Sequence, residues 1–457
     1  MGISMQVLGL FAGLGFLVFV HEFGHYLFAR LFGTRVEKFY LFFNPGFSIL
    51  RMKKINGRFR FSFFSPKPPD DWTEHPEATE WGIGWLPFGG YCSISGMVDE
   101  TKSAKDLANE RQPWEFRSKP AWQRFFIISG GVIMNFLTAC IIYIAIMFTW
   151  GKEYIPLENA KYGLIFSNAA QYAGFQHGDQ IVSVDGATPN TLFDFVKKLL
   201  VENPKEVTIL RNNELFTLHL KEDNWKRLLG DQFCNFNFPF VIEEVSSGYP
   251  AANAGLRKGD SLVGINNLKI FLFSDFQDEF RDSKNKDILL HFYREDSLYS
   301  ASVFVNEDGK IGVLPVSPYK YLQTVTENFG FIESIPAGIK EGIHQLTFYV
   351  KQFKRIFTKE GASQLGGFIT IGSIYPKVWE WGVFWTMTAL LSVILAFMNI
   401  LPIPALDGGY ILFIIIEMIT GRKPSDKFIG YANTVGFVIL IMLLLYANGM
   451  DFVRLFK

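Results

Sequence analysis

Two histidines and a glutamate stand at the end of an apolar run close to the start of the chain. Residues 16–26 read FLVFVHEFGHY, so Glu22 follows His21 directly and His25 lies four positions after His21. On a helix, side chains at i and i+4 share one face and lie about 5–6 Å apart. Two imidazoles so placed can bind one tetrahedral Zn²⁺, and the neighbouring carboxylate can take a proton from the metal-bound water. The pattern predicts one Zn²⁺ per chain, with His21 and His25 as ligands and Glu22 as the catalytic base.

These residues belong to a segment, about 3–32, that is apolar enough to span a membrane. Ionisable groups facing lipid cost several kcal/mol, so those found in a spanning helix are usually functional. The structural alternative is His–Glu pairing between neighbouring helices. Gly13, Gly15 and Gly24 are expected to let another helix approach closely. No Lys or Arg precedes Arg30 and no small-residue cleavage site follows, so we interpret the segment as a retained helix and not a signal peptide.

A hydrolytic zinc site needs a third protein ligand and an open position for water. Asp407, in PIPALDGGY, stands out because few other ionisable residues lie near membrane depth. Pro402 and Pro404 end an apolar segment, and Asp407 then starts a short helix. The alternative is that Asp407 simply caps this helix, as Asp does well. Capping and metal binding are compatible, so the residues alone leave both open.

The composition indicates a protein that is partly membrane-embedded and partly soluble. Of 457 residues, 49% are hydrophobic and 19% are charged, against about 25% charged in soluble domains. The net charge of zero gives no basic field and no case for nucleic acid as a partner. The three cysteines, Cys92, Cys140 and Cys234, form no CxxC pair and no obvious disulfide framework.

Four segments have the length and apolarity of spanning helices, at about 3–32, 125–148, 383–401 and 431–445. The predicted fold class is therefore a polytopic α-helical membrane protein with added β-rich parts. The segments are expected in this order: a first membrane helix with HExxH at 1–33, a cytoplasmic or membrane-associated β region at 34–120, a second membrane helix at 121–150, two β-rich domains at 151–225 and 226–318, a linker with an amphipathic helix at 319–380, a third membrane helix with the LDG motif at 381–420, and a fourth at 421–457.

The soluble part between the second and third membrane helices repeats. Residues 173–181 read AGFQHGDQI and residues 254–262 read AGLRKGDSL, with an offset of 81 at every shared position. Two related β-rich domains follow. Lys and Arg are frequent in 34–120 and again just after residue 420, which places those loops in the cytoplasm and the repeats outside.

HEFGH in the first helix, together with NILPIPALDGG in the third, resembles the site-2 protease family of intramembrane zinc metalloproteases. The repeated AG-x3-GD pattern resembles bacterial PDZ domains, and two of them between the second and third helices resemble the bacterial regulator-of-sigma-E (RIP metalloprotease) type. The resemblance covers nearly the whole chain. It implies that His21, His25 and Asp407 are the zinc ligands and that Glu22 is the catalytic base.

The resemblance also implies a set of substrate-binding residues. Asn399, Pro402 and Pro404 match an N-x2-P-x-P stretch that is expected to contact substrate backbone. WGIGWLPFGGY resembles a membrane-associated β-hairpin ending in PxGGY, and its edge can pair with an unwound substrate strand. The residues expected there are Gly89, Gly90 and Tyr91. Three features depart from the family pattern: Val132 and Phe368 stand where Pro is common, and the insert around 58–80 is longer than usual and has no assigned role.

The function implied is cleavage of transmembrane segments of single-pass membrane proteins, of the anti-sigma factor or remnant signal peptide type, in the bacterial inner membrane. The active site is expected toward the cytoplasmic side, and the PDZ-like pair in the periplasm, where it filters substrates by size or binds peptide termini. Lipid is the other expected partner. Two rival functions are a non-catalytic PDZ scaffold, which needs no HExxH, and a zinc transporter, which needs polar residues along a full path.

Overall fold

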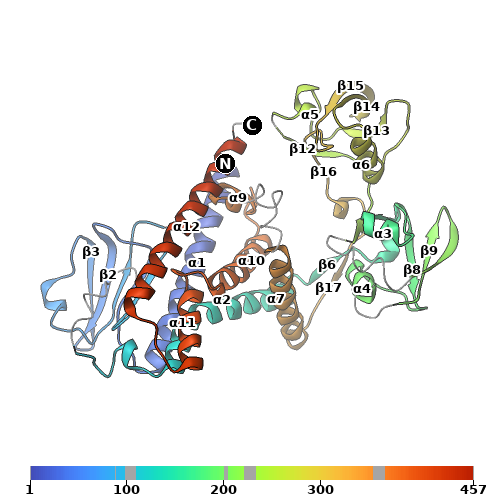
Figure 1. Cartoon of the computed structure of the whole chain (residues 1–457). Helices are drawn as coiled ribbons and strands as arrows, with labels where there is room; N and C mark the ends of the chain where they lie inside the picture. Colours follow the sequence, from blue (N-terminus) through green and yellow to red (C-terminus); the bar gives the residue numbers. More distant parts are fainter. Residues whose placement is uncertain are drawn as a thin grey trace. The chain divides into compact units, whose positions relative to one another are not determined.

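The computed structural model describes residues 2–87, 89–97, 110–199, 204–220, 233–246, 248–353 and 366–455. The chain divides into two compact units. The helical unit comprises residues 1–151 and 328–456, and the β-rich unit comprises residues 152–327. Figure 1 shows the long helices of the first unit with the sheet formed by β2, β3 and their neighbours, and the strands of the second unit.

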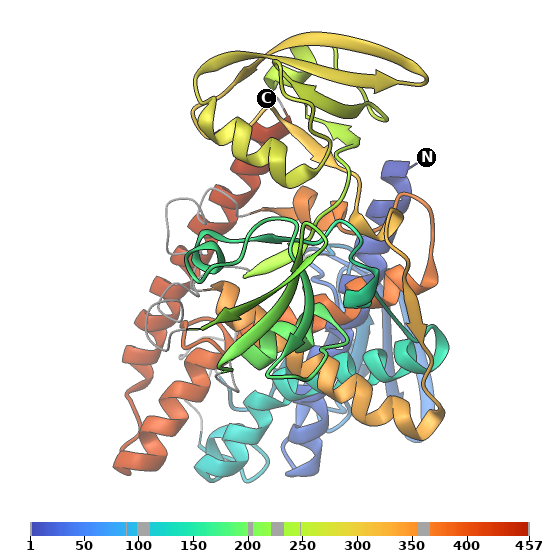
Figure 2. The same ribbon diagram turned by 90° about the vertical axis from the view of Figure 1, so that its right-hand side faces the viewer.

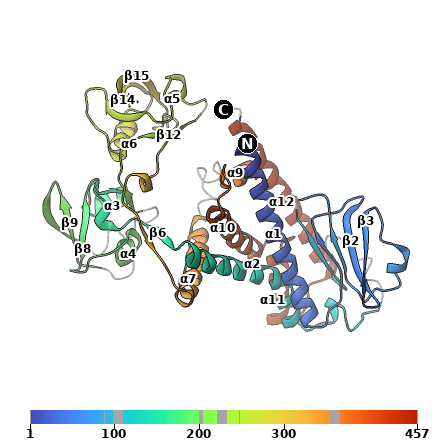
Figure 3. The same ribbon diagram turned by 180° about the vertical axis from the view of Figure 1, so that it is seen from behind.

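Four helices of the described chain are long and apolar enough to cross a membrane. They are α1 (Gly2–Leu31), α2 (Ala121–Thr149), α10 (Trp381–Ile400) and α12 (Asp426–Leu455). The prediction of four apolar helices of spanning length is confirmed, although α12 extends the predicted 431–445 at both ends. Figure 3 shows that α1 begins and α12 ends at the same end of the helical unit, as an even number of crossings requires.

The described part of this unit also contains the helices α7 (Phe331–Phe353), α9 (Phe368–Ser373) and α11 (Asp407–Thr420). Figure 2 shows α11 turning back into α12. The predicted amphipathic helix is α7, which lays Gly338 and Gly342 against α2 and leaves Ile339 and Ile343 exposed. Phe368 stands where Pro is common in the family, and the structure shows what its backbone does there. Its N–H donates to Asn448 Oδ1 (3.2 Å), a hydrogen bond that Pro cannot make.

Helices α1 and α2 cross where both carry glycine. A methyl group on Gly130 would lie 2.6 Å from the carbonyl oxygen of Gly24, and one on Gly24 would collide with the Gly130 carbonyl. The expectation that Gly24 lets a helix approach is confirmed. Gly13 and Gly15 instead make room for the side chains of Tyr375 and Phe42.

The segment after α1 folds into a five-stranded sheet with the order β3-β2-β4-β1-β5. The strands are β1 (Val36–Leu41), β2 (Ser48–Ile55), β3 (Arg58–Ser65), β4 (Glu80–Ile83) and β5 (Tyr91–Ile94). The predicted hairpin at 82–91 is wrong, because β4 and β5 do not pair with each other. Both pair with β1, β4 in parallel and β5 antiparallel. Gly82 permits this arrangement, since a side chain there would collide with the ring of Tyr40 on β1.

The insert around 58–80 supplies an edge strand and a cover for the sheet. β3 pairs with β2 through a tight turn at Asn56 and Gly57, which both have positive φ as such hairpins require. The short helix η1 (Asp70–Trp72) follows and buries Trp72 to 2% exposure. Lys53 donates from Nζ to the carbonyl oxygen of Trp72 (2.8 Å).

Beneath this cover lies a buried polar network. The Arg51 guanidinium and the Glu80 carboxylate form an ion pair at 2.7 Å, and Tyr40 donates its hydroxyl hydrogen to Glu80. Burial, followed by the bond to Glu80, raises the pKa of Tyr40 well above its ordinary value. A buried ion pair is tolerated only when its remaining groups are also bonded, so the network fixes β2 against β4 and β1.

Aromatic contacts attach the sheet to α1. Phe19 and Tyr26 of α1 meet the ring of Phe39 on β1 edge-to-face, with centroids 5.6 and 6.0 Å apart. Tyr26 also contacts Trp81 on β4 at 4.9 Å. These rings lie on the helix face beside the HExxH residues, so the sheet is held next to that site.

The β-rich unit contains two folds with matching strands. The strands and helices of the first are β7 (Leu164–Phe166), α3 (Asn168–Tyr172), β8 (Gln180–Val184), α4 (Leu192–Lys197), β9 (Glu206–Arg211), β10 (Glu214–His219) and β11 (Cys234–Phe236); those of the second are β12 (Ile242–Val245), α5 (Pro250–Asn253), β13 (Ser261–Ile265), α6 (Phe273–Asp282), β14 (Lys286–Arg294), β15 (Ser297–Val305) and β16 (Val313–Pro315). The strands β6 (Lys152–Tyr154) and β17 (Val325–Glu327) pair where the chain enters and leaves the unit.

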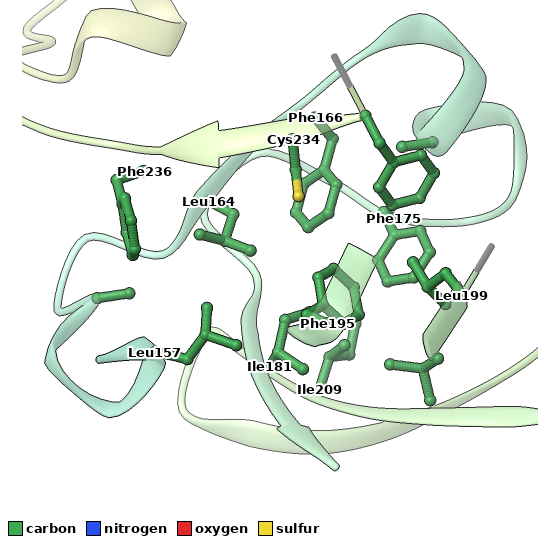
Figure 4. Close-up of a cluster of buried hydrophobic side chains, with 14 of the residues drawn as sticks. Leu157, Leu164, Phe166, Phe175, Ile181, Phe195, Leu199, Ile209, Cys234 and Phe236 are labelled. Carbon is green, nitrogen blue, oxygen red and sulfur yellow. The ribbon is translucent and has the colours of Figure 1, made fainter. Parts of the chain in front are cut away.

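The offset of 81 residues continues into the two hydrophobic cores. Phe195 and Phe276 are equivalent buried residues, as are Ile209 and Leu290. Figure 4 shows Cys234 and Phe236 of β11 in the first core, opposite β7. The expected domain boundary at 225/226 lies outside the described residues, but the chain from Phe233 to Phe236 packs with the first fold.

The repeated Gly-Asp pair has the same role in both copies. The Asp179 carboxylate is fully buried and accepts from the Gln176 N–H (2.8 Å) and from Arg211 (2.7 Å). In the second copy Asp260 accepts from the Arg257 N–H (2.8 Å) and from Arg294 (2.8 Å). The motif therefore ties a turn to a distant strand in each fold.

We predict that Gly24→Ala forces α1 and α2 apart and lowers the stability of the protein by about 1–3 kcal/mol, as overpacking does. The measurement is thermal unfolding of the purified full chain in detergent. Gly449→Ala is the matched control, because a methyl group on this glycine of α12 enters open space. Equal unfolding temperatures for the two variants would contradict the role assigned to this crossing.

Candidate metal centre

Three candidate ligand atoms from two helices far apart in sequence meet inside the helical unit. His21 Nε2 lies 3.2 Å and His25 Nε2 lies 3.4 Å from Asp407 Oδ2. The two Nε2 atoms lie 3.3 Å from each other. These three residues are the one group of His, Cys, Asp and Glu side chains in the described chain that is spaced to hold a metal ion.

The geometry suits zinc. Ligand atoms bonded to Zn²⁺ at about 2.0–2.2 Å in a tetrahedron lie about 3.3–3.6 Å from one another. The three observed separations of 3.2–3.4 Å are close to this edge length. Asp407 Oδ2 is buried and makes no hydrogen bond, although two imidazole nitrogens are near it. An unpaired buried carboxylate oxygen facing two nitrogens is the arrangement expected of a ligand set. The residues present therefore fit a zinc ion.

Helix α2 orients the second histidine. His25 Nδ1 lies 3.0 Å from the carbonyl oxygen of Ile127, which can only accept, so Nδ1 carries the hydrogen. Nε2 then keeps its lone pair for a metal. Gly131, one turn after Ile127, leaves space for both rings. A methyl group there would lie 2.5 Å from His21 Cε1 and 2.6 Å from His25 Nε2.

Asp407 is the first residue of α11, and Leu406 precedes it as the N-cap. No side chain caps this helix, so the alternative that Asp407 is a simple cap is not what the structure shows. The loop before it is tightly held. Ala405 has a φ of 77°, and its N–H donates to Asn433 Oδ1 of α12 (3.3 Å). A side chain at Gly408 would collide with the carbonyl oxygen of Leu401.

A cavity of about 500 Å³ opens next to the three residues. Glu22 lines it together with His21, His25 and Asp407. The backbone just before β5 lies close to Glu22, because a methyl group on Gly90 would lie 3.4 Å from Glu22 Cγ. A carboxylate, three candidate ligands and a strand edge thus share one cavity.

The structure brings some of the predicted substrate-binding residues to the cavity and not others. Gly90, Tyr91 and Asn399 line it. Pro402, Pro404 and Gly89 are not part of its described lining. Pro402 is exposed, and Pro404 packs where side chains at Gly409 and Gly436 would clash. Their place is in the turn that leads to Asp407.

Two asparagines at the site had been given no role from the sequence, although Asn135 closes the stretch of the second helix in which Val132 replaces the family's Pro. Asn433 lines the cavity and donates from Nδ2 to the hydroxyl oxygen of Tyr410 (2.7 Å). Asn135 of α2 is fully buried beside His21. In the sequence, an amide side chain within an otherwise apolar helix could have indicated a role at the site for either residue. For Asn135, its position one turn after Gly131 was a second indication. The absence of Pro at Val132 leaves α2 continuous through this stretch.

An HExxH helix and an aspartate from a second helix, meeting within an apolar bundle, define a membrane-embedded metallopeptidase. The chain belongs to peptidase family M50, the site-2 protease family, whose model matches residues 9–65 and 69–443. It is 28% identical to a protein named protease RseP from Yersinia pestis, with both chains fully covered. It is also 28% identical to the regulator of sigma-E protease RseP from Escherichia coli strain K12 and 27% identical to a putative zinc metalloprotease from Vibrio cholerae, with 97% of each chain covered. The protein is a zinc metalloprotease.

We predict that Asp407→Ala loses zinc affinity by at least about 100-fold, because one of three ligands disappears. The measurement is metal content and chelator competition on the purified full chain. Asp426→Ala, at the start of α12, is the control and should keep one equivalent of zinc. Unchanged affinity in Asp407→Ala would remove Asp407 from the metal site.

Proposed function

We propose that this chain is an intramembrane zinc endopeptidase that cleaves transmembrane segments of single-pass membrane proteins. Its substrates are of the anti-sigma factor or remnant signal peptide class, and its membrane is the bacterial inner membrane. The convergence of His21, His25 and Asp407 within 3.2–3.4 Å, on helices apolar enough to span a bilayer, carries the proposal.

In this proposal His21, His25 and Asp407 hold the zinc ion. When bound, Zn²⁺ supplies Lewis-acid chemistry, lowering the pKa of water to about 7 and polarising a peptide carbonyl. Glu22 takes the proton from the attacking water and later gives it to the leaving amine. Its place in the cavity wall beside the ligands suits both transfers.

Strand β5 is the candidate platform for the substrate. A transmembrane helix hides its carbonyls in hydrogen bonds, so the scissile region must become extended before attack. In the described chain β5 lies at the end of the strand order, next to β1, and three of its residues, Tyr91, Cys92 and Ile94, line the cavity. An extended segment can add to that edge by backbone hydrogen bonds. Asn399 of α10 also lines the cavity, and we propose that it contacts the same segment.

The proposed orientation places the sheet and the site toward the cytoplasm. His25 lies six residues before Leu31, the last residue of α1, which is about 9 Å along the helix axis. The sheet follows directly after this end of α1. Basic residues that remain outside the sheet's buried network, such as Lys54 and Arg58, favour a cytoplasmic position for that side. The N-terminus, the β-rich unit and the C-terminus are then periplasmic.

The two folds of the β-rich unit are proposed to be PDZ-like domains that screen substrates. The support is the repeated AG-x3-GD motif and the core positions that recur 81 residues apart. Screening by size, or by binding a newly exposed C-terminus, would restrict access to substrates already trimmed by another protease.

Neither rival function accounts for the site as well. A PDZ scaffold has no need for Glu22 beside three convergent ligands. A zinc transporter needs polar groups along a complete path through the membrane. The relatives named as proteases argue in the same direction.

We predict that Glu22→Gln abolishes cleavage of a model transmembrane substrate, by at least about 10²-fold, while zinc stays bound. The measurement is proteolysis in reconstituted vesicles together with zinc content. Glu158→Gln, in the β-rich unit, is the control and should cleave normally. Persistent cleavage by Glu22→Gln would refute the assignment. The zinc-loaded variant can also retain substrates in native membranes for identification.

A further inference from the structure

One face of α2 lies against both histidines. Ile127, Gly131 and Asn135 follow each other at intervals of four residues, so they share that face. Ile127 provides a carbonyl oxygen to His25, and Gly131 provides space for both rings. Asn135 is the third member, and its amide nitrogen lies 3.3 Å from His21 Nδ1. It has no exposed surface.

We propose that Asn135 is a positioning residue that holds His21 in its metal-binding tautomer through a side-chain hydrogen bond. The inference rests on the proposed zinc site. If His21 binds metal through Nε2, which faces His25 and Asp407, then Nδ1 must carry the hydrogen. Nδ1–H needs an acceptor, and the only acceptor on the Asn135 side chain is Oδ1.

The amide of Asn135 can meet this need by turning end for end. With the amide nitrogen toward His21, Oδ1 is buried and has no hydrogen-bond partner. Rotating the Asn135 amide by 180° exchanges its oxygen and nitrogen. Oδ1 then lies next to His21 Nδ1–H, where the amide nitrogen lies now. Oxygen is the end of the amide that a metal-loaded imidazole prefers, because its Nδ1–H becomes a stronger donor.

The backbone of Asn135 is fixed independently of the amide. Ser392 of α10 donates from Oγ to the Asn135 carbonyl oxygen at 2.7 Å, and both residues are fully buried. This bond ties α10 to α2 at the level of His21. The two histidines are then oriented by one helix, His25 through a main-chain carbonyl and His21 through a side-chain carbonyl.

A neutral amide also suits the charge of the site. One Zn²⁺ with the carboxylates of Glu22 and Asp407 sums to zero. A third carboxylate at this depth would leave one uncompensated negative charge, which is costly in a membrane. Asn provides an acceptor for Nδ1–H and adds no charge.

The test is zinc affinity of the purified full chain, measured by chelator competition, with the visible spectrum of the Co²⁺-substituted protein as a second readout. Asn135→Leu and Asn135→Ala lack the acceptor and should bind zinc about 10–100-fold more weakly, with altered Co²⁺ bands. Asn135→Asp keeps an acceptor. Its added charge should lower the stability of the protein but is partly compensated when Zn²⁺ binds, so this variant should bind zinc at least as tightly as the unchanged protein. Ser129→Ala, on the same helix, removes a buried hydroxyl without a partner and should change nothing.

A packing role alone would predict a different pattern, in which Asn135→Asp is harmed as much as Asn135→Leu. Wild-type affinity and an unchanged Co²⁺ spectrum in both Asn135→Leu and Asn135→Ala would overturn the inference. His25→Ala separates it from the proposed function. If His25→Ala still binds zinc tightly, the proposed metal site is wrong. If only His25→Ala loses zinc, the site stands and the role of Asn135 is wrong.

Discussion

The close contact of α1 and α2 at Gly24 and Gly130 is the constraint on which the metal centre depends. Zinc ligands must converge within about 3.5 Å of each other, which leaves little tolerance for helix displacement. Without side chains at the crossing, α2 comes near enough for the Ile127 carbonyl to reach His25 and for Gly131 to clear both rings. A helix pair held by ordinary side chains would lie farther apart, and these contacts would be lost.

Asp407 joins the metal centre from a position almost four hundred residues later in the chain. Its approach depends on a turn in which Ala405 adopts a positive φ, Asn433 of α12 binds the loop, and Gly408 lies against the Leu401 carbonyl. Strain of this kind persists only where surrounding contacts enforce it. A further contact lies near the start of α2, where Arg124 forms an ion pair with Glu417 of α11 at 2.6 Å. Helix α2 thus contacts both halves of the site and holds them together.

Local patterns in the sequence predicted local chemistry well. HExxH predicts two imidazoles on one helical face because the period of a helix is fixed. Asp407 was identifiable because an ionisable group is rare near membrane depth. The 81-residue repeat predicted two related folds, and buried pairs such as Phe195 and Phe276 confirm the repeat. The hairpin predicted at 82–91 does not form, because β1, about forty residues earlier in the chain, lies between β4 and β5 in the sheet. Strand order is a non-local property that alternation along one strand does not contain.

The sequence by itself determined the membrane helices, the candidate ligands and the repeated folds, since each follows from periodicity, apolar length or a short motif. Only the tertiary structure decided which helix faces the histidines, that Gly131 and Asn135 stand there, and which predicted substrate residues line the cavity. It also showed that the insert covers the buried Arg51–Glu80 pair. The physical reason is distance along the chain. These contacts join residues that are about 20 to 400 positions apart when they do not lie on one element, and only packing selects among such pairings.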